Sequence, residues 1–160
     1  MSKPSSSSLN LPPVKLQTCV EDGIVKVYDP LRHKYVALTP EEFVRQHFTA
    51  FLSDNLGYPR TLMANEVKVE LNGMSKRCDT LVYSPRDGAP LMIVEYKAPD
   101  VEICQDTFDQ IVRYNMILKA RFLVVSNGLR HYCCAIDYRT GTYNFIPQVP
   151  SYVSLLGSEQ

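Results

Sequence analysis

The sequence predicts an α/β domain with the chain order helix, three strands, helix, strand, and three observations support this prediction. A capped amphipathic segment comes first, an Asn-Gly turn then joins two β-rich segments, and a second amphipathic segment separates two apolar runs. With 160 residues and 45% hydrophobic content, the chain can build one domain with its own core. We therefore expect a mixed central sheet flanked by helices.

The first 38 residues should lie outside this core. Residues 1–13 include four consecutive serines and a Pro-Pro pair, which offer little apolar surface to bury, so we expect a mobile N-terminal tail. Residues 14–38 should form a β-rich arm, because β-rich segments flank an Asp-Pro pair there. The core should span residues 39–147, and residues 148–160 should form a C-terminal tail.

The first helix is predicted from Thr39 to about Asn55. Thr39 is a favourable N-cap, Pro40 suits the first helical position, and Glu42 completes a capping box. Gly57 can end the helix, because glycine readily adopts the left-handed conformation. The face expected to enter the core carries Val44, Phe48, Phe51 and Leu52.

Three strands should follow this helix, over residues 62–71, 76–83 and 91–97. An Asn-Gly pair at 72–73 favours a tight hairpin turn between the first two, and residues 85–90 should form a longer turn before the third. Charged residues alternate with apolar ones along the first strand, so we assign them to a solvent-exposed face and leave them out of the site. These residues are Glu66, Lys68 and Glu70.

A second helix is predicted over residues 102–119, with the apolar run 122–125 behind it. This run should be a buried strand parallel to the one before the helix, because a helical crossover joins parallel neighbours. Two further strands are expected, over residues 131–136 and 143–146. The side chains that should face inward from the second helix are Phe108, Ile111, Val112 and Leu118.

Charged residues gather at the end of the third predicted strand. Glu95 and Lys97 follow an apolar run and should point to the same side, because strand side chains alternate. Asp79 lies on the preceding strand. Charges at a buried strand end need partners, and two carboxylates suit Mg²⁺ while a lysine beside them can orient or activate a water molecule. The alternative is a solvated Glu95–Lys97 ion pair, which would contribute little.

The two helices add further candidates. Glu41 falls within the apolar stripe of the first helix, whereas Glu42 lies at its edge and should serve the helix N-terminus. Gln110 and Tyr114 are one turn apart and share one face of the second helix. Alternatively, Glu41 also serves only the helix N-terminus, and Gln110 and Tyr114 are ordinary amphipathic surface.

In this order the motifs resemble the PD-(D/E)xK nuclease superfamily, and more narrowly the N-terminal nuclease domain of type I restriction-enzyme R subunits, including small stand-alone members. The resemblance covers about residues 28–147 and implies a restriction-endonuclease-like fold. The proline that commonly precedes the aspartate is absent, since Cys78 stands there. The matching segments are residues 38–46, 56–59, 76–79, 93–99 and 110–114.

The resemblance also implies roles for single residues. Its metal ligands are Asp79, Glu95 and the main-chain carbonyl of Tyr96, and the ion is Mg²⁺, or Mn²⁺ in its place. Lys97 is the catalytic lysine. Gln110 and Tyr114 form the Q-x-x-x-Y motif of related recombination nucleases, with Gln110 near Lys97 or the water and Tyr114 toward the substrate phosphate. Glu41 matches a helix glutamate that adds a further acid, and a further metal contact, to the site.

The charge balance bears on the partners. There are 17 basic and 17 acidic residues, so the whole chain offers no strong electrostatic attraction to phosphates, which argues against an autonomous tight DNA binder. A local basic groove or a partner protein could still hold DNA. Neither a helicase motor nor a specificity domain is recognisable, so a protein partner would supply specificity or translocation, and a homo-oligomer is compatible with the sequence.

Location and cysteine chemistry are predicted from simple patterns. No signal-like segment and no apolar run near the ~20 residues of a membrane span are present, which predicts a cytoplasmic protein without membrane contact. Five cysteines without C-x-x-C spacing indicate reduced thiols. A soft-metal site at His131, Cys133 and Cys134 is the alternative, but adjacent cysteines on an apolar strand are more often buried.

Two functions from different classes remain. The first is a Mg²⁺-dependent nuclease that hydrolyses DNA phosphodiester bonds, which the combination of Asp79, Glu95 and Lys97 favours. The second is a catalytically silent module that keeps the nuclease fold and serves protein or nucleic-acid assembly, which the balanced charge favours.

Overall fold

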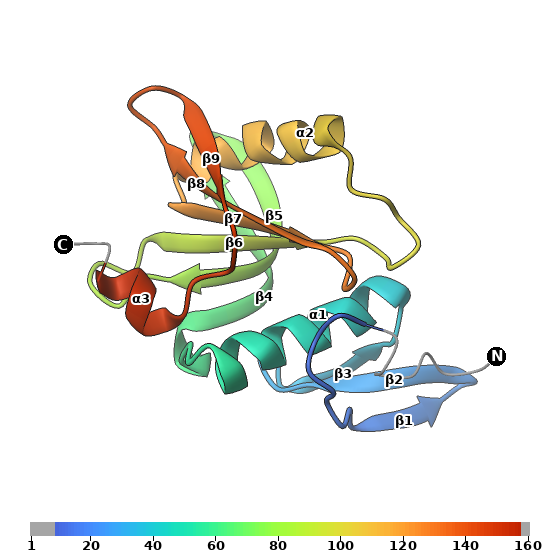
Figure 1. The fold of residues 1–160 in the computed structure, drawn as a ribbon. Coiled ribbons are helices and arrows are strands. Elements are labelled where there is room, and N and C mark those ends of the chain that lie inside the picture. The colour runs from blue at the N-terminus through green and yellow to red at the C-terminus, as the bar shows by residue number, and fades with distance from the viewer. Residues whose placement is uncertain (1–8, 158–160) are drawn as a thin grey trace.

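The computed structural model describes residues 9–157, except the side chains of Leu71 and Tyr114, so residues 1–8 of the predicted mobile tail and residues 158–160 lie outside the described residues. At its centre is a six-stranded sheet with the order β4-β5-β6-β7-β8-β9 (Figure 1). All neighbouring strands are antiparallel except β6 and β7. The strands are β4 (Met63–Leu71), β5 (Met74–Tyr83), β6 (Pro90–Tyr96), β7 (Phe122–Ser126), β8 (His131–Asp137) and β9 (Thr142–Ile146).

Helices cover both faces of this sheet, α1 on one side and α2 on the other (Figure 1). The helical segments are α1 (Pro40–Ala50), the π-helical η2 (Phe51–Asn55), the 3-10 turns η3 (Arg60–Leu62) and η4 (Met116–Leu118), α2 (Gln105–Asn115) and α3 (Tyr152–Gly157). The α1-side core includes Val44, Phe48 and Leu52, and the α2-side core includes Phe108 and Val112. Within residues 9–157, no helix has the length and apolar character of a membrane span.

The predicted fold class is confirmed, since the helix, the antiparallel strands, the crossover helix and the parallel strand occur in the expected order. Asn72 and Gly73 have φ angles of 53° and 77°, the left-handed values that a tight hairpin turn requires. Thr39 caps α1, because its Oγ1 accepts a hydrogen bond from the Glu42 amide at 3.1 Å. α2 starts later than expected, at Gln105, after a turn in which the Val101 amide donates to the Ala98 carbonyl.

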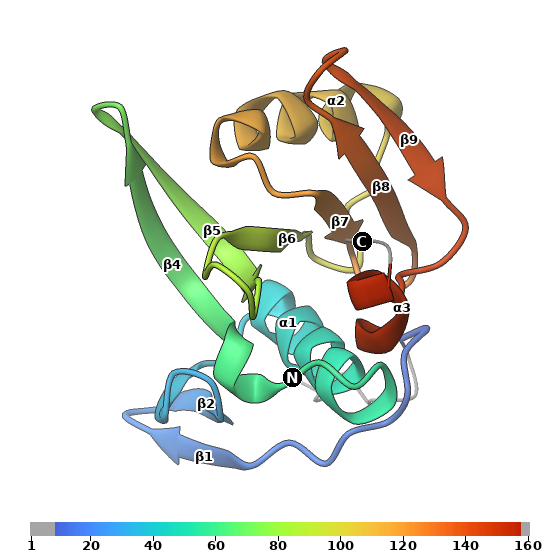
Figure 2. The same ribbon diagram turned by 90° about the vertical axis from the view of Figure 1, so that its left-hand side faces the viewer.

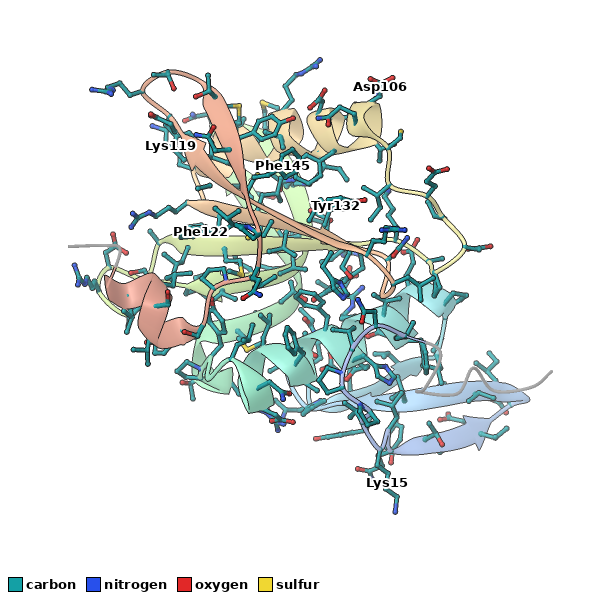
Figure 3. All side chains as sticks on the ribbon, viewed as in Figure 1. Lys15, Asp106, Lys119, Phe122, Tyr132 and Phe145 are labelled. Atoms are coloured by element: carbon teal, nitrogen blue, oxygen red, sulfur yellow. The ribbon has the colours of Figure 1, made fainter. Side chains whose placement is uncertain are left out.

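Aromatic packing attaches the last two strands to α2. The Phe108 ring lies 6.3 Å from the Tyr132 ring and 4.8 Å from the Phe145 ring, measured between centroids. Figure 3 labels Tyr132 and Phe145, which lie on the two outer strands. Such tilted and edge-on arrangements are favourable for aromatic pairs. The contact holds the outer antiparallel strands beside the helix that follows the central strand.

The N-terminal arm forms its own three-stranded antiparallel sheet, made of β1 (Thr18–Glu21), β2 (Ile24–Asp29) and β3 (Lys34–Ala37). β1 falls within the predicted β-rich arm but lies before the segments that flank the Asp-Pro pair, on which that prediction is based. α1 lies between this arm and the six-stranded sheet (Figure 2). Both chain ends also reach the core: the Asn10 amide donates to the Gly128 carbonyl at 2.8 Å, and Leu155 of α3 is buried in the α1-side core.

A chain of buried charges joins the arm to α1 and the sheet. Asp29, at the end of β2, accepts a hydrogen bond from Arg32, whose Nη2 donates to Glu42 Oε1 at 2.6 Å. Glu42 Oε2 lies 3.3 Å from Arg45 Nε, and Arg45 Nη2 donates to Glu66 Oε1 at 2.7 Å. We call these five residues the buried charge chain. Each charge is matched by an opposite one, as burial requires.

The contact at Gly128 gives a stability prediction. Gly128 has a φ of 86°, and an added Cβ would meet Leu9 Cδ2 at 2.8 Å and Val44 Cγ2 at 3.2 Å. Gly128→Ala should therefore combine backbone strain of about 1–2 kcal/mol with an overpacking cost of about 1–3 kcal/mol in urea unfolding. Gly141→Ala is the matched control, because Gly141 has a φ of 72° and nothing within 4 Å. Equal losses in the two variants would contradict the packing term.

Candidate active site

Six of the predicted site residues line one pocket of about 460 Å³. They are Glu41, Asp79, Glu95, Tyr96, Lys97 and Gln110. Ile111 also lines it, as does Lys76, which the sequence reasoning left out. The side chain of Tyr114 lies outside the described residues, so its predicted part in the site is untested. The pocket therefore draws on α1, β5, β6 and α2.

The regular alternation of β6 sets the direction of Glu95. Val94 and Tyr96 belong to the α1-side core, whereas Ile93 belongs to the α2-side core. Glu95 shares the parity of Ile93 and so faces α2, which contributes Gln110 to the pocket. Lys97 comes directly after the strand, and its amide donates to the Ser126 carbonyl at 2.9 Å, which continues the pairing with β7.

Asp79 reaches the pocket because the alternation of β5 breaks beside it. Cys78 packs in the α2-side core and Val82 in the α1-side core, although four residues of a regular strand would keep them on one face. The residue across the ladder from Asp79 is Glu66, which has a φ of 55° and is skipped in the strand pairing. Non-glycine residues in this conformation cost energy and concentrate near functional sites.

Asp79 is held at both its side chain and its main chain. Its Oδ2 accepts a hydrogen bond from the Tyr96 amide at 2.9 Å, and its carbonyl accepts one from Arg45 Nη1 at 3.1 Å. The Arg45 guanidinium lies 5.7 Å from the centroid of the Tyr96 ring, and Tyr96 donates its hydroxyl to Thr80 Oγ1 at 2.8 Å. Arg45 therefore ties the two strands that carry the pocket acids to α1.

Lys76 forms an ion pair with Glu95 inside the pocket. Its Nζ lies 3.2 Å from Glu95 Oε1, and the two side chains are only 6% and 12% exposed. The pKa of Glu95 is raised to about 8, because burial disfavours the charged form and the nearby Asp79 adds repulsion that Lys76 offsets only in part. The sequence did contain an indication that Lys76 is buried. Lys76 lies two residues before the apolar Cys78, so strand alternation places the two side chains on the same face.

Two glutamates have partners other than those expected. Glu42 was expected to serve the helix N-terminus, but its buried carboxylate pairs with Arg32 and Arg45, and only the Thr39 half of the capping box forms. Glu66 was assigned to the exposed face, but it accepts a hydrogen bond from Arg45 at 2.7 Å. The reason in both cases is the buried guanidinium of Arg45, which requires carboxylates around it. Glu41 is exposed at the pocket rim.

The described residues do not form a metal site from protein side chains alone. Among residues 9–157, no group of three or more His, Cys, Asp or Glu side chains is placed to hold a metal ion. An ion between Asp79 and Glu95 would therefore need oxygens from the main chain, water or substrate. The soft-metal alternative is disfavoured, because Cys133 and Cys134 are buried in opposite cores and His131 Nδ1 is 2.7 Å from Ser126 Oγ.

The fold and the pocket together define a restriction-endonuclease-like α/β domain with acids and lysines gathered where the end of β6 lies beside β5. The family model described as "Type I restriction enzyme R protein N terminus (HSDR_N)" matches residues 40–150. The chain belongs to this family.

A solved structure supports the fold assignment. It is the fragment structure of a putative HsdR subunit of a type I restriction enzyme from Vibrio vulnificus YJ016, with 23% sequence identity and a TM-score of 0.53. The match covers 75% of this chain and 25% of that one, so this chain corresponds to about a quarter of its length. A search of curated proteins gives no match.

The raised pKa of Glu95 predicts how the stability of the metal-free protein depends on pH. Below pH 4.5 the carboxyl is protonated in both the folded and unfolded states, and above about 8 it is ionised in both. Between these values the folded state binds the proton more tightly, so this group makes stability fall as pH rises, by on the order of 5 kcal/mol. Glu95→Gln removes this dependence.

Urea unfolding of wild type and Glu95→Gln in EDTA, across pH 4.5 to 9, checks this expectation through the difference between the two curves. The variant should gain stability relative to wild type as the pH rises. Glu70→Gln is the control, because Glu70 is 72% exposed and its difference curve should be flat. A flat difference curve for Glu95→Gln as well would refute the raised pKa.

Proposed function

We propose that this chain is a Mg²⁺-dependent nuclease domain that hydrolyses phosphodiester bonds of DNA. The observation that carries the proposal is the single pocket that combines the carboxylates of Asp79 and Glu95 with Lys97. Membership of the restriction-enzyme R protein family supports it, because the description of that family names a type I restriction enzyme. A cytoplasmic location would suit such a substrate.

The residues of the pocket suit a hard divalent cation. Two carboxylates offer oxygen ligands, and the Tyr96 carbonyl and Glu41 are further oxygen donors on residues that line the same pocket. The raised pKa of Glu95 means that the positive charge within the protein does not fully stabilise its ionised form. Mg²⁺, or Mn²⁺ in its place, would supply charge stabilisation of the phosphate and acidify a water molecule.

The remaining roles belong to side chains of this chain. Lys97 would position the attacking water and stabilise negative charge on the phosphate, as a flexible ammonium can. Gln110, from α2, would orient the same water or Lys97 by hydrogen bonding, and Tyr114 would contact the phosphate. Arg45 would act indirectly, because it fixes the carbonyl of Asp79 and the ring of Tyr96.

Tight binding of DNA should require a contribution from outside this chain. The formal net charge is zero, so non-specific attraction to DNA should be weak. We therefore propose that a protein partner supplies target choice or translocation. A homo-oligomer that combines two pockets is an alternative source of affinity.

A catalytically silent module is the second candidate function. The observation in its favour is the ion pair of Lys76 with Glu95, which already gives one pocket acid a cationic partner. Such a module would keep the fold and serve protein or nucleic-acid assembly. Its pocket would show no metal-dependent cleavage of any DNA form.

Cleavage assays on single-stranded, duplex and branched DNA test the proposed function. With Mg²⁺, wild type should cleave at least one form, and Lys97→Ala should lower the rate by about 100-fold or more, because a positioned proton-transfer or charge-stabilising group contributes at least that much. Lys34→Ala is the control, since Lys34 is exposed on β3 of the arm. Cleavage that persists in EDTA or in Lys97→Ala would exclude the proposed chemistry.

Metal titration provides a test that does not depend on turnover. In the Lys97→Ala background, which should leave the DNA intact, Mn²⁺ should bind weakly alone and more tightly with a short DNA present, because two protein carboxylates rely on substrate oxygens to complete the ligand set. Adding Glu95→Ala should abolish the difference in calorimetry. An equal response with and without Glu95 would favour the silent module.

A further inference from the structure

Lys76 is an unusual lysine, because its side chain is only 6% exposed although it lies at a pocket. Lysine is rarely buried unless it is paired, since removing an ammonium from water is costly. For comparison, Lys68 on the neighbouring strand is 62% exposed. The burial of Lys76 therefore needs a reason within the pocket.

The reason is the pair of acids that converge there. Asp79 and Glu95 line the same pocket, and like charges in a buried setting repel each other strongly. The ammonium of Lys76 lies 3.2 Å from Glu95 Oε1, so it supplies positive charge at one of the two acids. The other acid, Asp79, accepts a hydrogen bond from the Tyr96 amide, a neutral donor. The positive charge of Lys76 thus acts at Glu95, one of the two carboxylates that the proposed function assigns to the metal.

We propose that Lys76 is the resident cation of this pocket: without metal, its ammonium takes the place at Glu95 that a divalent cation takes on binding, so the two compete for one carboxylate. This inference rests on the proposed metal site at Asp79 and Glu95. Lys76 is a positioning residue in this scheme, because it acts on Glu95 and has no assigned contact with substrate. Its four-carbon stem lets the ammonium move aside when a stronger cation arrives.

Removal of the ammonium changes the electrostatics at Glu95 in a definite direction. A divalent ion is repelled by a nearby ammonium twice as strongly as a proton at the same point, because the energy scales with the charge. Loss of Lys76 should therefore favour the metal over the proton at Glu95, whatever the pH. A purely structural lysine predicts the reverse, since its loss would loosen the pocket and weaken binding.

The experiment compares Lys76→Met with wild type by calorimetric titration of MnCl₂ into the full chain at pH 8.5, with and without a short DNA. Methionine keeps an unbranched stem and removes the charge. The dissociation constant of Lys76→Met should fall by about tenfold or more, because a full charge close to the metal is lost. Lys68→Met is the control, an exposed lysine paired with Glu70, and should bind Mn²⁺ as wild type does.

Thermal melting tests the proposal if Lys76→Met folds too poorly for the calorimetric titration. In EDTA, Lys76→Met should be less stable than wild type, because Glu95 loses its cation, and saturating Mn²⁺ should restore it by a larger shift than wild type shows. A variant that unfolds in EDTA and folds with Mn²⁺ supports the proposal. A variant that stays unfolded in saturating Mn²⁺ overturns it, because the metal then fails to replace the lysine.

The outcomes also separate this inference from the proposed function. If wild type binds Mn²⁺ and Lys76→Met binds it equally or more weakly, the resident-cation role is wrong and the metal site stands. If only Lys76→Met binds, the role is supported and the wild-type chain is the silent module. If neither binds, even with DNA, the metal site itself is lost and the inference with it.

Discussion

The burial of the Arg45 guanidinium is the constraint on which the rest of the structure depends. Its side chain is only 6% exposed, and it contacts α1, β4, β5 and β6 at once. Such a charge is tolerated only when carboxylates surround it, which places Glu42 and Glu66 beside it. Glu42 in turn requires Arg32, so the arm packs against α1 for an electrostatic reason as well as an apolar one.

The pocket also contains buried charges, but its positive and negative charges are balanced differently. Around Arg45 each charge has an opposite neighbour, whereas in the pocket the two acids Asp79 and Glu95 lie near one buried lysine, Lys76, which pairs with Glu95. The pKa of Glu95 is raised first by its burial and then by the nearby Asp79, and Lys76 offsets this only in part. The ion pair between Lys76 and Glu95 is therefore the contact at which the two proposed functions, nuclease and silent module, differ.

The sequence predicts those parts of the site that depend on local periodicity. Glu95 lies on a regular strand, so alternation gives its direction, and the turn at Asn72 and the cap at Thr39 rest on local backbone chemistry. The direction of Asp79 does not follow from alternation, because the break near Glu66 changes the faces of both strands and no residue pattern predicts that break. The partners of Glu42 come from distant segments, which periodicity cannot report.

The buried charge chain also shows that residues before the start of the family match belong to the folded domain. The family match starts at residue 40, yet Asp29 and Arg32 lie before that point and hold Glu42 on the inner face of α1. Asn65 on β4 likewise donates to Asp29 at 3.0 Å and accepts from Thr80 at 2.6 Å. A chain cut at the family boundary would leave these buried polar groups without partners next to the strand that carries Asp79. The arm is therefore part of the electrostatic interior of the domain, and a fragment intended to fold on its own must contain both the arm and the core.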